Sequence, residues 1–150
     1  MEPLKNIREI REEQSLKQKD MAGILGINRS TYASYEIERD TIPIYHLNKL
    51  CNYFDISIDY AVGLNEKKNY LNSKPDIDKE LLKIRLKEMR KDNQLTQVDI
   101  AKILNISRST WTGYEYGKFQ IPTLILLEIA SRYNCSMDYL LGKINKDSLK

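Results

Sequence analysis

Apolar positions recur at helical spacing along most of the chain. Ile7 and Ile10 begin the pattern near the start, and Leu82, Leu86 and Met89 repeat it in the second half. Such spacing predicts amphipathic helices. No segment alternates apolar and polar residues with the period of two that marks a strand. The pattern therefore predicts an all-α protein.

The chain contains one internal repeat. A shift of 79 positions places residues 7–64 over 86–143 without a gap and with 21 identical residues. The match includes QKDMAGILGINRSTYASYE over QVDIAKILNISRSTWTGYE. A gapless match of this length predicts one fold that is present twice. We expect domains over 1–64 and 78–145, a linker over 65–77 and a tail over 146–150.

Start and stop signals predict five short helices in each copy. We expect them over about 4–13, 18–25, 28–36, from Pro43 onward and over 57–62, and over about 77–92, 97–104, 107–115, from Pro122 onward and over 136–141. Asn28, Ser107 and Thr96 are good N-caps for these helices, whereas Lys17 is not. Gly26 and Asn105 suit a left-handed turn between the second and third helix of each copy.

Composition narrows the class of protein. The 150 residues are 41% hydrophobic and 30% charged, as in soluble globular proteins. No stretch approaches the roughly 18 apolar residues of a membrane span, and the charged start lacks the apolar segment of a signal peptide. We therefore expect a cytoplasmic location and no membrane partner. Cys51 and Cys135 lie far apart without CxxC spacing, so we expect buried thiols and neither metal nor cofactor.

Charge divides unevenly between the two copies. The formal net charge is +3, which by itself does not indicate a nucleic-acid partner. Residues 1–64 hold 8 Lys and Arg against 10 Asp and Glu, whereas residues 79–150 hold 13 against 8. We expect the second copy to supply most of any attraction for phosphate.

Each copy resembles the Cro/repressor-type (XRE-like) helix-turn-helix family. The residues that carry the resemblance are Gln18, Ala22, Gly26, Tyr35, Glu36, Pro43, Asp59, Tyr60 and Gly63, and most recur in the second copy. The resemblance implies two tandem five-helix lambda-repressor-like domains. It also implies a phage or bacterial transcriptional regulator, repressor or autoregulator, that binds a pseudo-palindromic or asymmetric operator in double-stranded DNA.

The resemblance implies a set of DNA contacts. The candidates are Gln18, Asn28, Arg29, Ser30, Ser34 and Arg39 in the first copy, and Gln97, Ser107, Arg108, Ser109, Gly113 and Lys118 in the second. Arginine suits the bidentate contact to guanine, and capping residues can donate to phosphate. We expect Ser34 and Gly113 on the exposed face of the third helix, where the glycine would remove a base-reading side chain.

Two features of the family pattern separate structural roles from DNA contacts. The family implies internal ion pairs between Arg11 and Glu36 and between Arg90 and Glu115. After the glutamate the family has a glycine and a basic residue, which the second copy keeps as Gly117 and Lys118. The first copy instead reads Ile37-Glu38-Arg39-Asp40, and its two acids are expected to weaken phosphate binding.

The second copy also has apolar residues outside its expected core stripe. These are Ile77, Leu81, Leu124, Ile125 and Leu127. An excess of apolar surface for so small a domain suggests a contact with the first domain or with a second subunit in a homodimer.

The sequence also bears on two other classes of function, a protein-binding module and an enzyme. One or both domains, and more readily the acidic first one, can instead bind a protein partner, as antitoxin-like or inhibitor proteins do. An enzyme is disfavoured, because the chain has one histidine and no glycine-rich phosphate loop. For DNA reading, the thirteen-residue linker spans at most about 43–47 Å when fully extended, which allows one chain to occupy two half-sites.

Overall fold

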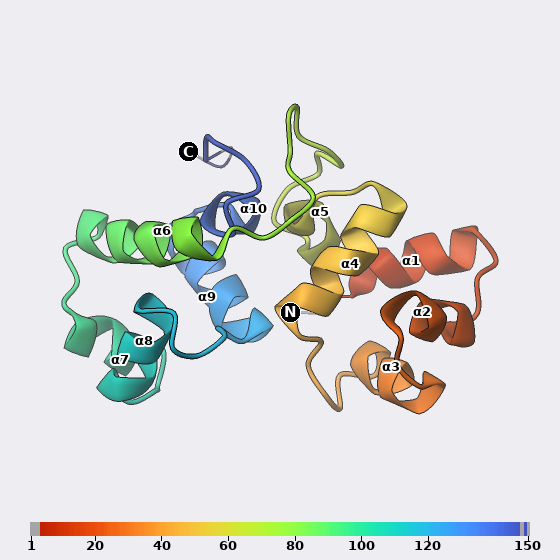
Figure 1. The fold of residues 1–150 in the computed structure, drawn as a ribbon, viewed down its shortest axis with the longest axis horizontal. Helices are drawn as coiled ribbons and strands as arrows, with labels where there is room; N and C mark the ends of the chain where they lie inside the picture. Colours follow the sequence, from red (N-terminus) through yellow and green to blue (C-terminus); the bar gives the residue numbers. More distant parts are fainter. Residues whose placement is uncertain (1–3, 148, 150) are drawn as a thin grey trace. The chain divides into compact units, whose positions relative to one another are not determined.

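Two units of similar size make up the chain. The computed structural model describes residues 4–147 and 149. Unit 1 spans Met1–Pro75 and unit 2 spans Asp76–Lys150. Across the described residues the secondary structure is helical, with ten helices and no strand, which confirms the all-α prediction (Figure 1). None of the helices in this part of the chain has the length and apolar character needed to cross a membrane.

Each unit contains five helices in the same order. Unit 1 holds α1 (Lys5–Glu13), α2 (Gln18–Leu25), α3 (Arg29–Glu36), α4 (Ile44–Phe54) and α5 (Ile58–Val62). Unit 2 holds α6 (Lys79–Asp92), α7 (Gln97–Ile103), α8 (Arg108–Glu115), α9 (Thr123–Tyr133) and α10 (Met137–Leu140). The expected helices lie within a residue or two of these bounds. In each unit the second and third helices pack against each other across a short turn.

Side-chain caps begin several of these helices where the sequence places them. Asn28 Oδ1 accepts the Thr31 N–H at 2.8 Å at the start of α3. Ser107 Oγ accepts the Thr110 N–H at 3.0 Å at the start of α8. Thr96 caps α7 in the same way. These bonds satisfy N–H groups that have no partner inside the helix.

The turns of the two units use left-handed backbone at equivalent positions. Residues with positive φ include the pairs Ser15 and Gln94, Gly26 and Asn105, Glu38 and Gly117, Asp55 and Asn134, and Gly63 and Gly142. The same shift of 79 residues relates the members of each pair. Backbone of this kind is costly for most L-residues, so it marks turns that the fold requires. The repeat in sequence is therefore a repeat of the backbone path.

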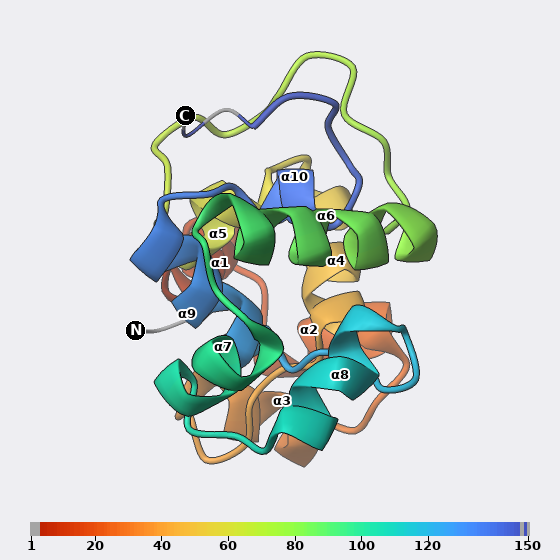
Figure 2. The ribbon, with the colours of Figure 1, turned by 90° about the vertical axis from the view of Figure 1, so that its left-hand side faces the viewer.

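Equivalent apolar residues form the core of each unit. Fully buried examples are Ile7, Met21, Tyr32, Leu47 and Leu50 in unit 1, and Leu86, Ile100, Trp111, Leu126 and Ile129 in unit 2. Tyr32 and Trp111 occupy the same place in the repeat, on the inner side of α3 and α8. In unit 2, α6 packs against both α8 and α10 (Figure 2). The core thus holds the third helix of each unit by its inner face.

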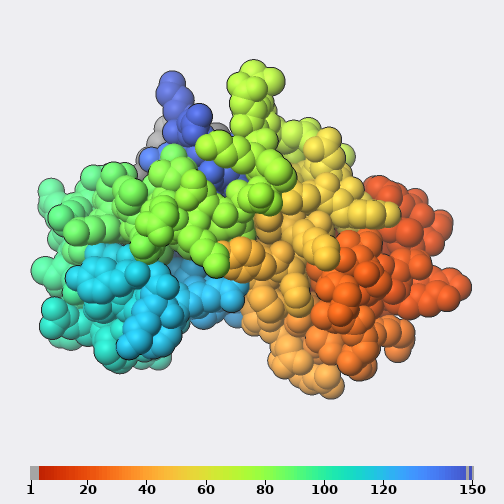
Figure 3. All heavy atoms as spheres, in the orientation of Figure 1, coloured from red at the N-terminus to blue at the C-terminus, as the bar shows by residue number. Residues whose placement is uncertain are grey.

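The segment after α5 is bonded back onto unit 1. We call residues 65–75 the arm; it follows α5 along the chain and is drawn in yellow-green (Figures 1 and 3). Tyr70 Oη donates to Asp59 Oδ2 at 2.8 Å. The Asn48 and Asn52 side-chain amides donate to the Pro75 carbonyl at 3.0 and 2.8 Å. Much of the segment expected as a linker over residues 65–77 is therefore hydrogen-bonded to α4 and α5 of unit 1.

Candidate nucleic-acid interface

The start of the third helix in each unit is exposed. Arg29 and Ser30 open α3, and Arg108 and Ser109 open α8; all four are exposed. The capping residue before each pair is exposed as well. Because the opposite face of each helix holds a core aromatic residue, these side chains point out from the unit. Each unit thus presents an arginine and a hydroxyl group next to a helix N-terminus, whose partial positive charge favours anions.

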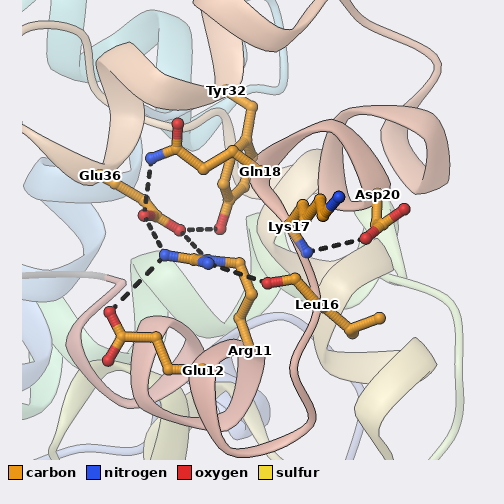
Figure 4. A network of polar contacts seen from close by, with 8 residues as sticks. All are labelled: Arg11, Glu12, Leu16, Lys17, Gln18, Asp20, Tyr32 and Glu36. Atoms are coloured by element: carbon orange, nitrogen blue, oxygen red, sulfur yellow. Dashed lines mark hydrogen bonds and ion pairs between the residues drawn. The ribbon is translucent and has the colours of Figure 1, made fainter.

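In unit 1 an ion pair joins Arg11 on α1 to the buried Glu36 at the end of α3 (Figure 4). Glu36 accepts hydrogen bonds from Arg11 Nε at 2.8 Å and Nη2 at 2.9 Å. Tyr32 Oη donates to the same carboxylate at 2.6 Å, and Gln18 Nε2 donates at 3.1 Å. Since Glu36 is buried, these four bonds fix the carboxylate. They also hold the half-buried Gln18 side chain at the start of α2.

Unit 2 repeats the network with one extension. Glu115 accepts from Arg90 Nε at 2.9 Å and Nη2 at 2.8 Å, and from Trp111 Nε1 at 2.6 Å. Gln97 Oε1 accepts from Arg108 Nη2 at 3.4 Å. The glutamine at the start of α7 is therefore in contact with the exposed arginine at the start of α8. The structure brings both expected ion pairs together and joins two of the expected contact residues in unit 2.

The electrostatics of these networks keep both pairs ionised at neutral pH. Burial by itself raises the pKa of Glu36, but hydrogen bonds from Arg11, Tyr32 and Gln18 outweigh it and the net pKa is lowered. The pKa of Glu115 is lowered in the same way, against burial, chiefly by the bond from Arg90. Hydrogen bonds to the glutamates raise the pKa of both arginines. Such satisfied pairs support the neighbouring helices and leave no free charge for a ligand.

The structure corrects the placement of Ser34 and Gly113. Both were expected on the exposed face, but Ser34 is 1% exposed and Gly113 is buried. Ser34 Oγ donates to the Thr31 carbonyl at 2.7 Å. A Cβ atom added to Gly113 would lie 2.1 Å from Cδ2 of Phe119. The glycine therefore makes room for a ring from the following loop, and neither residue is available to a ligand.

The loop after the third helix differs between the units. In unit 1, Glu38 has φ of 61°, and the Arg39 guanidinium lies 3.9 Å from the Asp40 carboxylate. In unit 2, Gly117 takes the left-handed position with φ of 76°, and Lys118 Nζ lies 5.5 Å from the centroid of the Phe119 ring. Arg39 and Lys118 are both exposed. The basic residue of unit 1 is thus paired with an acid, whereas that of unit 2 lies over an apolar ring.

Four further positions, two inside the third helices and two at their C-caps, were not among the expected contacts. Ala33 and Thr112 are half-buried, and Ile37 and Tyr116 are 69% and 64% exposed. They follow the leading arginine of each helix by four and eight residues, so helical spacing alone places them on its face. These positions differ between the units, so they are the ones at which the two surfaces diverge.

The apolar residues expected at an interface differ in how far they are exposed. Leu127 is buried, Ile125 is half-buried and Leu124 is 43% exposed. Ile77 and Leu81 are half-buried. Leu81 packs close to Gly142 of its own unit. A Cβ atom added to this glycine would lie 3.1 Å from Cβ of Leu81. A contact made by the other residues with a second surface stays a prediction.

Comparison with known sequences agrees with this geometry. A family profile described as a helix-turn-helix domain matches residues 5–67 and again 84–146. The uncharacterised HTH-type transcriptional regulator YobD of Bacillus subtilis is 34% identical over 80 residues, which cover 47% of this chain and 71% of the relative. The HTH-type transcriptional regulator ImmR of B. subtilis is 42% identical over 59 residues, covering 39% of this chain and 46% of the relative.

A relative of another kind also matches. Antitoxin PezA of Streptococcus pneumoniae is 33% identical over 58 residues, covering 39% of this chain and 37% of the relative. No solved structure matches the chain significantly. The two profile matches together span most of the sequence and coincide with the two five-helix units. The chain therefore belongs to the helix-turn-helix family and carries that domain twice.

Proposed function

We propose that this chain is a sequence-specific regulator of transcription that binds double-stranded DNA through α3 and α8. The observation that carries the proposal is the exposed Arg-Ser pair at the start of each helix, whose last residue is the glutamate of an ion-pair network. An arginine so placed can reach the edge of a guanine in the major groove. Relatives named as transcriptional regulators support this reading.

Within this proposal, unit 2 is the main DNA anchor. Residues 79–150 carry 13 Lys and Arg against 8 Asp and Glu, while residues 1–64 carry 8 against 10. Lys118 is free of the acidic neighbour that Arg39 has in Asp40. Each released counterion strengthens binding, so the more basic unit contributes more affinity. Unit 1 then adds a second, weaker contact with the DNA. A protein bound over a promoter in the cytoplasm acts as a repressor or autoregulator.

The test is a salt series on DNA selected by the protein from a random pool. Binding is expected to weaken steeply as salt rises. Arg108→Ala should weaken binding about 5- to 150-fold, which corresponds to about 1–3 kcal/mol of lost base contact. Arg29→Ala should have a smaller effect. Arg132→Ala is the matched control. It removes the same charge from an exposed arginine, but on α9 and not on the third helix.

Two results would contradict the proposal. The first is binding that does not respond to salt or to the DNA sequence. The second is an equal loss of affinity for Arg108→Ala and Arg132→Ala, which would reduce the role of Arg108 to net charge.

A second candidate function is binding of a protein partner by unit 1. The match to a protein named as an antitoxin favours it, as do the acids Glu38 and Asp40 beside α3. Asp40→Lys separates the two readings. If α3 lies on DNA, the substitution should strengthen DNA binding, because it removes a negative charge and adds a positive one. Unchanged DNA binding would favour the protein partner for unit 1.

A further inference from the structure

We propose that the arm sets the spacing between the two DNA-reading units, with Asn48 and Asn52 as its positioning residues. The inference rests on the proposed function for its consequence on DNA. Its physical basis, the bonding of the arm to unit 1, is independent of that function.

The arm is joined to unit 1 first at the start of α5. The Ser57 backbone N–H donates to the Lys68 carbonyl at 2.5 Å, and Ser57 Oγ donates to the Lys67 carbonyl at 3.2 Å. Ser57 is buried and caps α5. The Asn69 side-chain amide donates to the Asp55 carbonyl just before that cap. The first part of the arm therefore completes the hydrogen bonding of a buried helix start.

The middle of the arm is hydrogen-bonded to a buried carboxyl group. Asp59 has no exposed surface, and Tyr70 Oη donates to its Oδ2 at 2.8 Å. Asn65 Nδ2 in turn donates to Tyr70 Oη at 3.0 Å. Removing one donor from a buried acceptor costs more than an exposed hydrogen bond gains. Detachment of Tyr70 from unit 1 is therefore unfavourable.

The end of the arm is held by two amides on one face of α4. Asn48 and Asn52 both donate to the Pro75 carbonyl. Unit 2 holds the chain again at Asp78, whose N–H donates to the Leu141 carbonyl at 2.9 Å. Only residues 76 and 77 separate the last residue held by unit 1 from the first held by unit 2.

This bonding shortens the tether between the units. A free segment of thirteen residues reaches at most about 43–47 Å. The three steps from Pro75 to Asp78 reach at most about 10–11 Å. With the arm bonded, the two readers can therefore serve only a narrow range of half-site spacings. With the arm released, they could serve many.

The repeat supplies an independent observation. The equivalents of Asn48, Asn52 and Tyr70 in the second copy are Leu127, Ser131 and Leu149. The two amide donors thus occur in the first copy and not in the second. The profile of the helix-turn-helix domain ends at residue 67 in the first copy, so most of the arm lies outside it. The bonds from Asn48 and Asn52 to Pro75 are therefore not part of the repeated pattern.

The bonding itself is tested first, without DNA, on the full chain. Labels at Glu13→Cys and Asp92→Cys, both exposed, report the distribution of distances between the units, since the native Cys51 and Cys135 are buried. Asn48→Ala/Asn52→Ala should broaden this distribution and speed hydrogen exchange at the Ser57 amide. Lys49→Ala, on the exposed side of the same helix, is the control and should change neither.

The single variant Asn52→Ala keeps this test decisive if the double variant fails to fold, because Asn52 is exposed and its amide holds Pro75 at the shorter distance. An unchanged distance distribution in a folded variant would overturn the inference.

The second test uses the duplex selected by the protein, with zero to five base pairs inserted between its two halves. Loss of simultaneous contact should weaken wild-type binding by about 100-fold or more at unfavourable spacings. The Asn48→Ala/Asn52→Ala variant should bind these duplexes with a much smaller spread of affinities. Equal spacing tolerance in both proteins, or a selected site with one half only, would overturn the inference. Failure to bind any duplex would overturn the proposed function instead, while the label experiment still decides the bonding of the arm.

Discussion

The helices α3 and α8 share the motif Arg-Ser-Thr and the same buried ion pair, yet the space behind them is filled differently. In unit 1 the sixth residue of the helix is Ser34, and the loop that follows contains Asp40. In unit 2 it is Gly113, and the loop brings Phe119, whose ring lies where a side chain on that glycine would be. The differences Ser34/Gly113 and Asp40/Phe119 therefore belong together, because the glycine makes the space that the phenylalanine ring fills.

A second difference lies in the turn that links each of these helices to its loop. The left-handed residue is Glu38 in unit 1 and Gly117 in unit 2. Glutamate is strained in this conformation, whereas glycine is not. Unit 1 therefore carries both the less favourable turn and the extra negative charge. Unit 2 combines a relaxed turn with a basic residue.

The largest expected effect is the loss of stability when the arginine of an ion pair is replaced, and it should differ between the two units. Arg90→Met leaves Glu115 buried without its main partner and should destabilise unit 2 by about 3–5 kcal/mol. Arg11→Met should cost less, because the side chains of Arg11 and Glu36 are 13% and 3% exposed, against 9% and 1% for Arg90 and Glu115. Urea unfolding with hydrogen exchange resolved for each unit measures both. An equal or greater cost for Arg11→Met would remove this asymmetry.

The next effect tests the match between Gly113 and Phe119. Gly113→Ala should destabilise unit 2 by about 1–3 kcal/mol, because its methyl group collides with the ring. In a Phe119→Ala background the same change should stabilise the unit by about 0.5–1 kcal/mol, since alanine is the better helix former. Thermal unfolding of the four proteins in this cycle measures the sign. A cost for Gly113→Ala in both backgrounds would show that something other than Phe119 requires the glycine.

A smaller effect is expected at the turn. Glu38→Gly should stabilise unit 1 by about 1 kcal/mol, because it removes the strain of a left-handed glutamate. Gly117→Ala should destabilise unit 2 by at least as much, since its Cβ would also lie 2.6 Å from Cδ of Lys83. Denaturant midpoints for the two single variants check the pair. A loss of stability for Glu38→Gly would mean that this side chain makes a favourable contact.

The smallest expected effect is the change of stability with pH near neutrality. The folded-state pKa values of Glu36 and Glu115 are lowered, so their contribution to stability is complete above the ordinary carboxyl pKa of about 4.3. It is lost as pH falls through the lowered values. Melting temperatures should therefore show no contribution from these groups between about pH 6 and 8, and a loss in acid. Glu115→Gln/Arg90→Met should flatten part of the acid limb; an unchanged acid limb would contradict the assignment.

Much of the fold follows from local signals in the sequence. Asn28, Ser107 and Thr96 are caps because their side chains bond to N–H groups three residues away, and such bonds depend on neighbours in the chain. The turn at Gly26 and its equivalent Asn105 follow from the backbone preferences of those residues. The repeat strengthens each of these signals, because every local pattern occurs twice.

The remaining features depend on contacts that local patterns do not contain. Ser34 and Gly113 were placed on the wrong face because the loop after each helix folds back over that position, and helical spacing says nothing of the loop. Tyr70 and Pro75 lie in a polar segment that resembles a free linker. Their partners are on α4 and α5, and no periodicity connects them.

The bonding of the arm also determines where the chain can be divided into separately expressed halves. A cut after Leu64, where the sequence repeat ends, would remove the hydrogen bonds that join Ser57 to the Lys67 and Lys68 carbonyls and the bond from Tyr70 to Asp59. A cut between residues 76 and 77 would keep every described bond of the arm in the first half and the Asp78 cap in the second. Fragments made at the first boundary should unfold more readily than those made at the second.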